Sequence, residues 1–123
     1  MQKLSEKEIV KLISDGAHFE CELLDGSFSV KVEAYTPAIC TAVHDGHKFS
    51  KELESHCALS ESERLFEEDP YTGELIESMP ITMIGLDSRY EYDLNRPLAR
   101  CIYNKAWGKE VWNKNLPKSL RRK

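Results

Sequence analysis

The first third of the chain carries two periodic patterns, one helical and one extended. Apolar residues recur at helical spacing after Ser5, and Glu8 completes a capping box, which predicts a helix over residues 5–15. Residues 19–23 and 28–32 then alternate apolar with polar side chains on either side of an Asp-Gly turn. This arrangement predicts a β-hairpin after the N-terminal helix.

The middle of the chain contains apolar runs separated by polar segments. Residues 38–43 show little alternation, which is typical of a strand buried on both faces in the interior of a mixed sheet. Residues 81–86 predict a second apolar strand and residues 90–94 a third extended piece, whereas residues 98–103 fit either an extended or a helical segment. Short helices are expected in the polar stretches, over residues 50–57, from Ser60, and over residues 72–78.

The composition is that of an ordinary globular domain. The chain has 123 residues, of which 41% are hydrophobic and 31% charged, so we expect a single domain over residues 1–123. A net charge of −4 argues against a general nucleic-acid binder. No apolar run is long enough for a membrane span and the N-terminus lacks a signal region, so the expected location is the cytoplasm. The four cysteines lack C-x-x-C spacing, and we expect them to be reduced and mostly buried.

Candidate chemistry begins where the apolar run 38–43 ends. His44 and His47 follow it in a turn that contains Gly46, and strand ends are where α/β proteins place metal ligands and catalytic groups. Neutral imidazole is a common zinc ligand, so two histidines three apart can form the first half of a zinc site. The alternative is that both are ordinary surface loop residues.

An acidic run precedes the next turn. Glu67, Glu68 and Asp69 stand side by side before Pro70, and their mutual repulsion costs stability unless a cation lies near. The alternative is a solvated charge run.

A third polar segment, residues 88–97, is rich in groups that recognise carboxylates. Arg89 and Arg96 carry planar forks that match two carboxylate oxygens, and Asn95 adds both a donor and an acceptor. Asp93 is placed to hold one of the arginines, with plain surface salt bridging as the alternative.

Taken together, four segments resemble N-formylglutamate amidohydrolases. They are A-x-H-D-G-H, E-R-L-F-E-E-D-P-Y-T-G-E-L, S-R-Y-E-Y-D-L-N-R-P and W-G-K-E-V-W, and they lie within residues 38–112. D-L-N-R is the most specific of these elements. The resemblance implies the α/β fold of zinc carboxypeptidases and aspartoacylases, a mixed β-sheet flanked by helices, here with an N-terminal helix and β-hairpin. It also implies a zinc-dependent hydrolase that cleaves the amide bond of an N-acyl amino acid with a free carboxylate.

The resemblance assigns metal ligands. His44 matches the first zinc ligand of the family. His47 falls where carboxypeptidases have the glutamate of their H-x-x-E ligand pair, and Glu68 or Asp69 is the alternative second ligand.

The resemblance also assigns substrate contacts. Asn95 and Arg96 match the pair that grips the substrate carboxylate in carboxypeptidases. Arg89 matches the further arginine that polarises the scissile carbonyl, which makes it the catalytic candidate.

One departure from the family is large. Its members carry a third zinc ligand, a histidine on a later strand, and then a glutamate base, whereas no histidine follows His56 in this chain. We therefore expect the N-terminal part of a larger hydrolase domain, which binds zinc weakly and is inactive by itself. Two other classes remain open: a non-enzymatic carboxylate- or anion-binding module built on Arg89, Asn95 and Arg96, and a structural fragment that self-associates.

Overall fold

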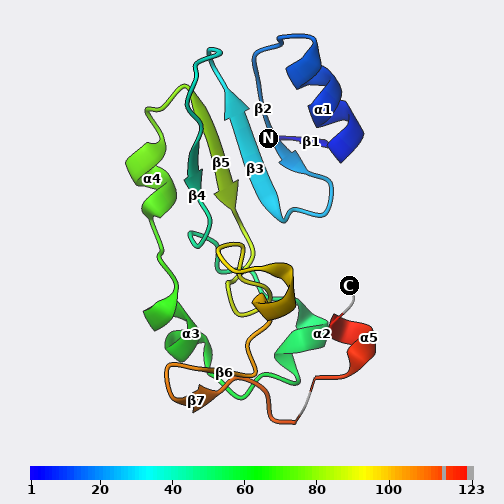
Figure 1. Ribbon diagram of the computed structural model, residues 1–123, viewed down its shortest axis with the longest axis vertical. Coiled ribbons are helices and arrows are strands. Elements are labelled where there is room, and N and C mark those ends of the chain that lie inside the picture. Colours follow the sequence, from blue (N-terminus) through cyan, green and yellow to red (C-terminus); the bar gives the residue numbers. More distant parts are fainter. Residues whose placement is uncertain (115, 122–123) are drawn as a thin grey trace.

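The computed structural model describes residues 1–114 and 116–121 and is built around a five-stranded mixed sheet (Figure 1). Its strands are β1 (Gln2–Leu4), β2 (Phe19–Leu23), β3 (Phe28–Val32), β4 (Cys40–Ala42) and β5 (Ile81–Gly85). The spatial order is β1-β2-β3-β5-β4, with β1 parallel to β2, β4 parallel to β5, and the other neighbours antiparallel. The expected mixed sheet with helices is confirmed, and so is the hairpin of β2 and β3.

Short helices and a small hairpin make up the remaining regular structure. They are α1 (Glu6–Ser14), α2 (Lys51–Glu54), α3 (Glu61–Glu67), α4 (Thr72–Ile76), the 3₁₀ helix η1 (Leu98–Arg100), the strands β6 (Lys105–Ala106) and β7 (Lys109–Glu110), and α5 (Lys118–Arg121). We call residues 1–43 and 72–86 the sheet region, and residues 44–71, 87–114 and 116–121 the loop region. Figure 1 shows the sheet region above and the loop region below it.

Helix α1 forms as its sequence predicts. The Ser5 side chain accepts a hydrogen bond from the Glu8 N–H, and the Glu8 carboxylate accepts one from the Ser5 N–H at 2.8 Å, which completes the capping box. The apolar face of the helix packs onto the sheet, where Ile9 joins Leu4 and Cys21 in a buried cluster. The sheet region therefore has its own small core.

Strand β4 differs from its expected place in the sheet. It lies at the edge, next to β5 alone, and only three residues of the apolar run pair. Ile39 is 64% exposed and Thr41 is exposed too, so the expectation of a strand buried on both faces is wrong. An apolar run indicates burial but does not say which strand has neighbours on both sides. Of the two apolar runs, the one that forms β5 has two neighbours and the one that forms β4 has one.

Residues 90–94 are not extended. The chain turns there, and burial does not follow the apolar alternation: Tyr90 and Asp93 are buried, whereas Leu94 is exposed. Residues 98–103 begin with the 3₁₀ helix η1.

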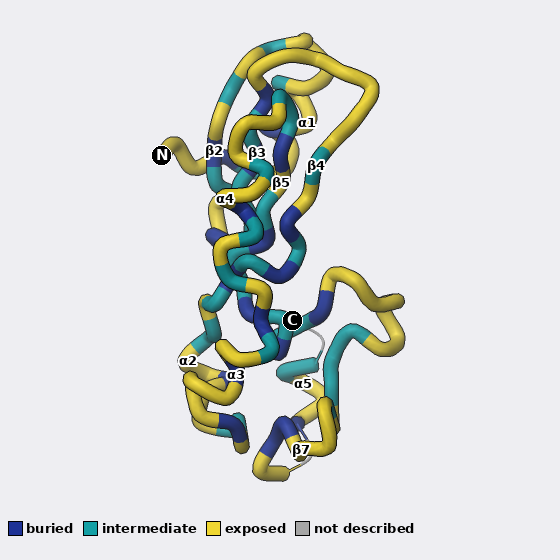
Figure 2. Tube along the Cα trace, turned by 90° about the vertical axis from the view of Figure 1, so that its left-hand side faces the viewer, coloured by how far each residue is buried: buried dark blue, intermediate teal, exposed yellow. Residues whose placement is uncertain are grey.

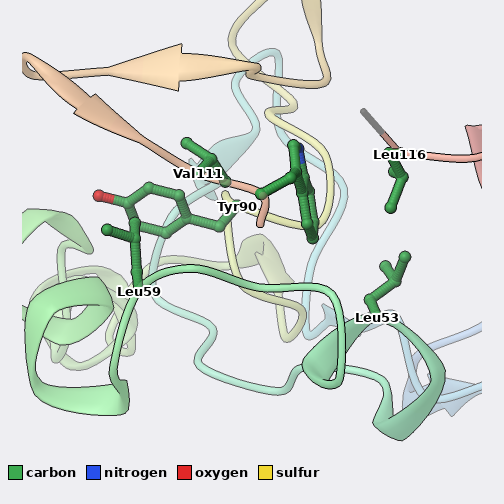
Figure 3. Packing of buried hydrophobic residues seen from close by; sticks show 6 residues of the cluster. Leu53, Leu59, Tyr90, Val111 and Leu116 are labelled. Atoms are coloured by element: carbon green, nitrogen blue, oxygen red, sulfur yellow. The ribbon is translucent and has the colours of Figure 1, made fainter. Parts of the chain in front are cut away.

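The loop region contains a second apolar core (Figure 3), and Figure 2 shows this region at the opposite end of the molecule from α1. Its buried members are Leu53, Leu59, Tyr90, Val111, Trp112 and Leu116. The Trp112 indole N–H donates to the Tyr103 carbonyl at 2.6 Å, so the polar atom of this buried ring is satisfied.

The cysteines and the helices bear on two further expectations. Within the described residues, all four cysteines are free, but Cys21 is buried and the other three are partly exposed, so the expectation that most are buried is wrong. No helix in the described part of the chain has the length and apolar character that a membrane crossing requires.

Candidate functional site

The candidate residues gather at the carboxyl ends of β4 and β5. Because these strands are parallel, His44 after β4 and Arg89 after β5 leave the same edge of the sheet. The chain then pairs once more, with the Lys48 N–H donating to the Leu86 carbonyl at 3.1 Å. A side chain at Gly46 would overlap the Leu86 backbone, so the H-D-G-H turn requires glycine at this position.

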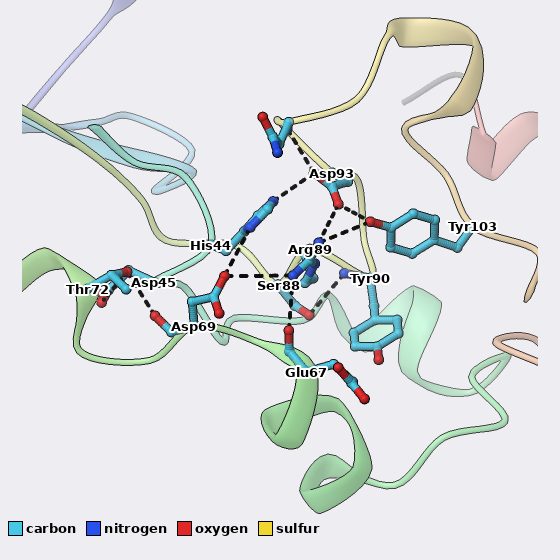
Figure 4. Close-up of polar contacts among 11 residues, drawn as sticks. His44, Asp45, Glu67, Asp69, Thr72, Ser88, Arg89, Tyr90, Asp93 and Tyr103 are labelled. Carbon is cyan, nitrogen blue, oxygen red and sulfur yellow. Dashed lines mark hydrogen bonds and ion pairs between the residues drawn. The ribbon is translucent and has the colours of Figure 1, made fainter. Parts of the chain in front are cut away.

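The His44 ring lies between two carboxylates (Figure 4). Its Nε2 is 2.7 Å from Asp93 Oδ1, and its Nδ1 is 3.3 Å from Asp69 Oδ2. A neutral imidazole has one N–H and can donate to only one of these carboxylates. The shorter contact assigns the N–H to Nε2, which leaves Nδ1 facing Asp69.

Main-chain contacts fix the distance between His44 and Asp69. The Asp69 N–H donates to the His44 carbonyl at 3.1 Å. Beside it, the Asp45 carboxylate accepts the Gly73 N–H at 2.8 Å. Helix α4 has no side-chain cap at Tyr71, whose φ of 69° is left-handed, so Asp45 supplies the cap from another loop. The two loops are therefore joined on both sides of the His44–Asp69 pair.

Asp93 is the centre of the polar network in Figure 4. Its Oδ1 accepts from His44 and from the Asn95 N–H at 2.8 Å, and its Oδ2 accepts from Arg89 at 3.0 Å and from the Tyr103 hydroxyl. Burial acts to raise the pKa of Asp93, but the hydrogen bonds outweigh it and hold that pKa below its usual value. The carboxylate is therefore charged when it faces His44.

Arg89 joins the two carboxylates of the site to an aromatic side chain. One terminal nitrogen donates to the Glu67 carbonyl at 3.0 Å and lies 3.7 Å from Asp69, and the other pairs with Asp93. The guanidinium carbon lies 4.9 Å from the Trp107 ring centroid. Asp93 thus holds an arginine, as the sequence indicated.

His47 has a different set of partners. Its Nδ1 bonds to Glu68, and its Nε2 lies 3.1 Å from Glu61 Oε1. The buried Glu68 side chain also accepts from the Ser88 hydroxyl. Burial acts to lower the pKa of His47, but the hydrogen bonds and charges of Glu68 and Glu61 outweigh it and raise that pKa. The two histidines therefore bind different acids.

The remaining candidates, Asn95 and Arg96, approach the network through their backbone. The Asn95 N–H donates to the Asp93 side chain and the Arg96 N–H to the Asp93 carbonyl, while both side chains are exposed. The structure thus brings Arg89, but not the side chains of Asn95 and Arg96, into contact with the carboxylates that hold His44.

Sequence reasoning missed two residues that contact buried carboxylates. Tyr103 lies in a segment without a recognisable pattern, and Ser88 begins the polar segment 88–97 but received no role there. Within the described residues, no group of three or more His, Cys, Asp or Glu side chains is placed to hold a metal ion.

Neither a family model, nor a curated protein, nor a solved structure matches this chain. The family resemblance seen in the sequence motifs therefore stays a prediction.

Proposed function

We propose that the chain is part of a zinc-dependent amidohydrolase that acts on N-acyl amino acids, of the N-formylglutamate amidohydrolase type and with a zinc carboxypeptidase-like fold. His44 and Asp69 supply two of the metal ligands in this proposal. The observation that carries it is the pairing of His44, whose Nδ1 faces Asp69 while its Nε2 bonds to the buried Asp93.

The donor set fits zinc for two reasons. Metal-bound histidines usually donate their other ring N–H to a carboxylate, as His44 does to Asp93, and this fixes both the tautomer and the ring orientation. One imidazole nitrogen and one carboxylate oxygen are also ordinary zinc ligands. Both ring nitrogens of His47 lie against Glu68 and Glu61, so Asp69 is the better second ligand.

The roles of the other residues follow from their contacts. Zinc, when bound, would polarise the amide carbonyl and lower the pKa of a water. Arg89 is a positioning residue in this structure, since its contacts hold Asp93 and Asp69 in place. Arg96 has an exposed guanidinium on the same segment and would take the substrate carboxylate, with Asn95 beside it.

The donor set also predicts weak binding. A catalytic zinc site takes three protein ligands and a water, and the proposal names two. We expect the isolated chain to bind zinc weakly and to leave N-acyl amino acids uncleaved.

Metal titration tests the ligand assignment. Zinc binding to protein prepared without chelator is measured by calorimetry for the parent chain, His44→Ala and Asp69→Ala, with His18→Ala as the control because His18 is exposed and distant in sequence. We expect His44→Ala and Asp69→Ala each to weaken binding at least about tenfold, and His18→Ala to leave it unchanged. Equal binding in all four proteins would overturn the assignment.

Two further results distinguish the alternatives. If zinc binding is lost in His47→Ala but retained in Asp69→Ala, then His47 and not Asp69 is the second ligand. Zinc-dependent turnover of N-formylglutamate by this chain would contradict the expected inactivity. A metal content that stays unchanged in His44→Ala would favour a non-enzymatic anion-binding module.

A further inference from the structure

A pocket separate from the His44 ring lies beside the β6–β7 hairpin. Its volume is about 370 Å³, and we call it the cationic pocket. Its lining residues are Arg96, Arg100, Tyr103, Lys105, Ala106 and Trp107. Three of them are positively charged and none is acidic.

The positive charges of this pocket are poorly neutralised. In the part of the chain that the structure describes, the guanidinium groups of Arg96 and Arg100 make no ion pair or hydrogen bond. Lys105 lies 3.9 Å from Glu110, but both side chains are more than half exposed, and such a pair contributes little. Converging cations in a concave site favour an anionic ligand.

An aromatic wall closes the same pocket. The Trp107 ring is fixed by edge contacts with Tyr103 at 5.7 Å and Tyr90 at 5.9 Å and by Arg89, yet the residue stays 48% exposed. Its φ of 49° is a left-handed conformation that costs energy for a bulky side chain. Asn is the usual residue before Gly in such a hairpin turn, so packing of the ring holds Trp107 in place against backbone preference.

We propose that the cationic pocket binds a small aromatic carboxylate. The carboxylate pairs with Arg100, Lys105 and Arg96, and the ring packs against Trp107 and Tyr103. This combination matches the two surfaces of the pocket, since a cationic rim alone would take any anion and an aromatic wall alone any planar ring. The inference shares Arg96 with the proposed hydrolase but needs no metal.

Indole NMR signals offer a direct readout, because the chain has two tryptophans and Trp112 is buried. We would titrate zinc-free, ¹⁵N-labelled protein with phthalate and, as a match in charge, with succinate. Phthalate should shift the Trp107 indole signal saturably, leave the Trp112 signal in place, and bind about tenfold more tightly than succinate. Equal affinity for the two probes, or no saturable shift, would overturn the inference.

Two variants and a control separate the contributions. Arg100→Gln should weaken phthalate and succinate alike, by about tenfold, because it removes a cation that both use. Trp107→Asn, which suits the left-handed backbone, should remove the preference for phthalate by calorimetry while succinate still binds. Lys109→Gln is the control, because it removes a charge from the same hairpin outside this pocket, and it should leave the affinities for phthalate and succinate unchanged. If it weakened binding as much as Arg100→Gln does, the attraction would be unspecific and the inference would be overturned.

The outcome is independent of the hydrolase proposal. Zinc binding that depends on His44 with no phthalate site would overturn this inference alone. Phthalate binding with no zinc site would leave the inference standing and overturn the ligand assignment.

Discussion

The sheet region and the loop region are stabilised in different ways. In the sheet region, strand pairing provides hydrogen-bond partners for the backbone, and the core forms around Ile9 of helix α1. The loop region has short helices and a two-stranded hairpin, and the buried Asp93 and the partly buried Arg89 make connections that a sheet would otherwise provide. The comparison teaches that the candidate chemistry and the stability of the loop region depend on the same polar groups.

The largest expected effect comes from Asp93→Ala. This change leaves the buried His44 and the partly buried Arg89 without their shared carboxylate, which should cost about 3–5 kcal/mol. The measurement is the free energy of unfolding in urea, together with hydrogen exchange to find which region opens first. Exchange should rise in the loop region before the sheet region.

Asp93→Asn is the matched control for this change. It keeps the size and one acceptor oxygen but loses the charge, so its stability should fall between those of the parent and Asp93→Ala. A free energy of unfolding unchanged in Asp93→Ala would mean that the network contributes nothing to the loop region.

A cavity in the other core should act on the other region. Ile9 is the buried residue of α1, and Ile9→Ala should cost about 3 kcal/mol. In the Ile9→Ala variant, hydrogen exchange should rise first in the sheet region, and the ring signals of His44 and Trp107 should stay unchanged in NMR spectra. Loss of those signals at low denaturant would show that the two regions unfold together, against the comparison.

The two capping boxes give a smaller, symmetric test. Ser5 caps α1 in the sheet region and Ser60 caps α3 in the loop region with the same hydrogen-bond pattern. Ser5→Ala and Ser60→Ala should each cost about 1 kcal/mol. Circular dichroism during urea unfolding measures both, and Ser60→Ala should in addition weaken zinc binding, because α3 leads into Asp69. Equal zinc binding in the two variants would argue that the end of α3 is held independently of its cap.

The smallest effect is on pH dependence. Burial raises the pKa of Asp87 and of Glu91 in the loop region, although the Tyr92 hydroxyl donates to Asp87 at 2.8 Å. A raised pKa means that the folded state binds the proton more tightly than the unfolded state does. The resulting contribution to the free energy of unfolding is fully present below about pH 4 and is lost as pH rises through the raised pKa.

Asp87→Asn should therefore become more stable relative to the parent as pH rises from 4 to 7, as measured by urea midpoints. Asp25 in the sheet region has the opposite sign, since hydrogen bonds from Ser27 lower its pKa below the usual value. Asp25→Asn should therefore lose stability relative to the parent as pH rises through the acid range up to about 4, below the range in which Asp87→Asn responds. A parallel response of both variants would contradict the assigned directions.

Local patterns account for the parts of the fold that were predicted. Helix α1 and the β2–β3 hairpin follow from capping, periodicity and a turn, all within a few residues. Strand β1 was missed because Gln2–Leu4 holds a single apolar residue, and the edge position of β4 depends on which distant strand pairs with it. Residues 90–94 show the same limit, since their apolar alternation resembles a strand although the chain turns and buries Tyr90 and Asp93.

The site was anticipated in its residues more than in its contacts. His44, Asp69 and Arg89 were all singled out, but spacing alone favoured His44 with His47 as the metal pair. The observed partners of His44 lie 25 and 49 residues away, and a pattern read over a few positions does not report such contacts. Tyr103 reaches Asp93 only because η1 returns the chain to the network.

The edge position of β4 has a consequence for the chemistry next to it. Among the described residues, this strand has one neighbour, β5, so the hydrogen-bonding groups of its outer side face away from the sheet. Helix α4 packs against β4, so a further strand that paired with β4 would lie beside this helix. In the proposed hydrolase, a strand added parallel to β4 would end level with His44, and a segment following it would be placed to supply the ligands that the proposal does not name.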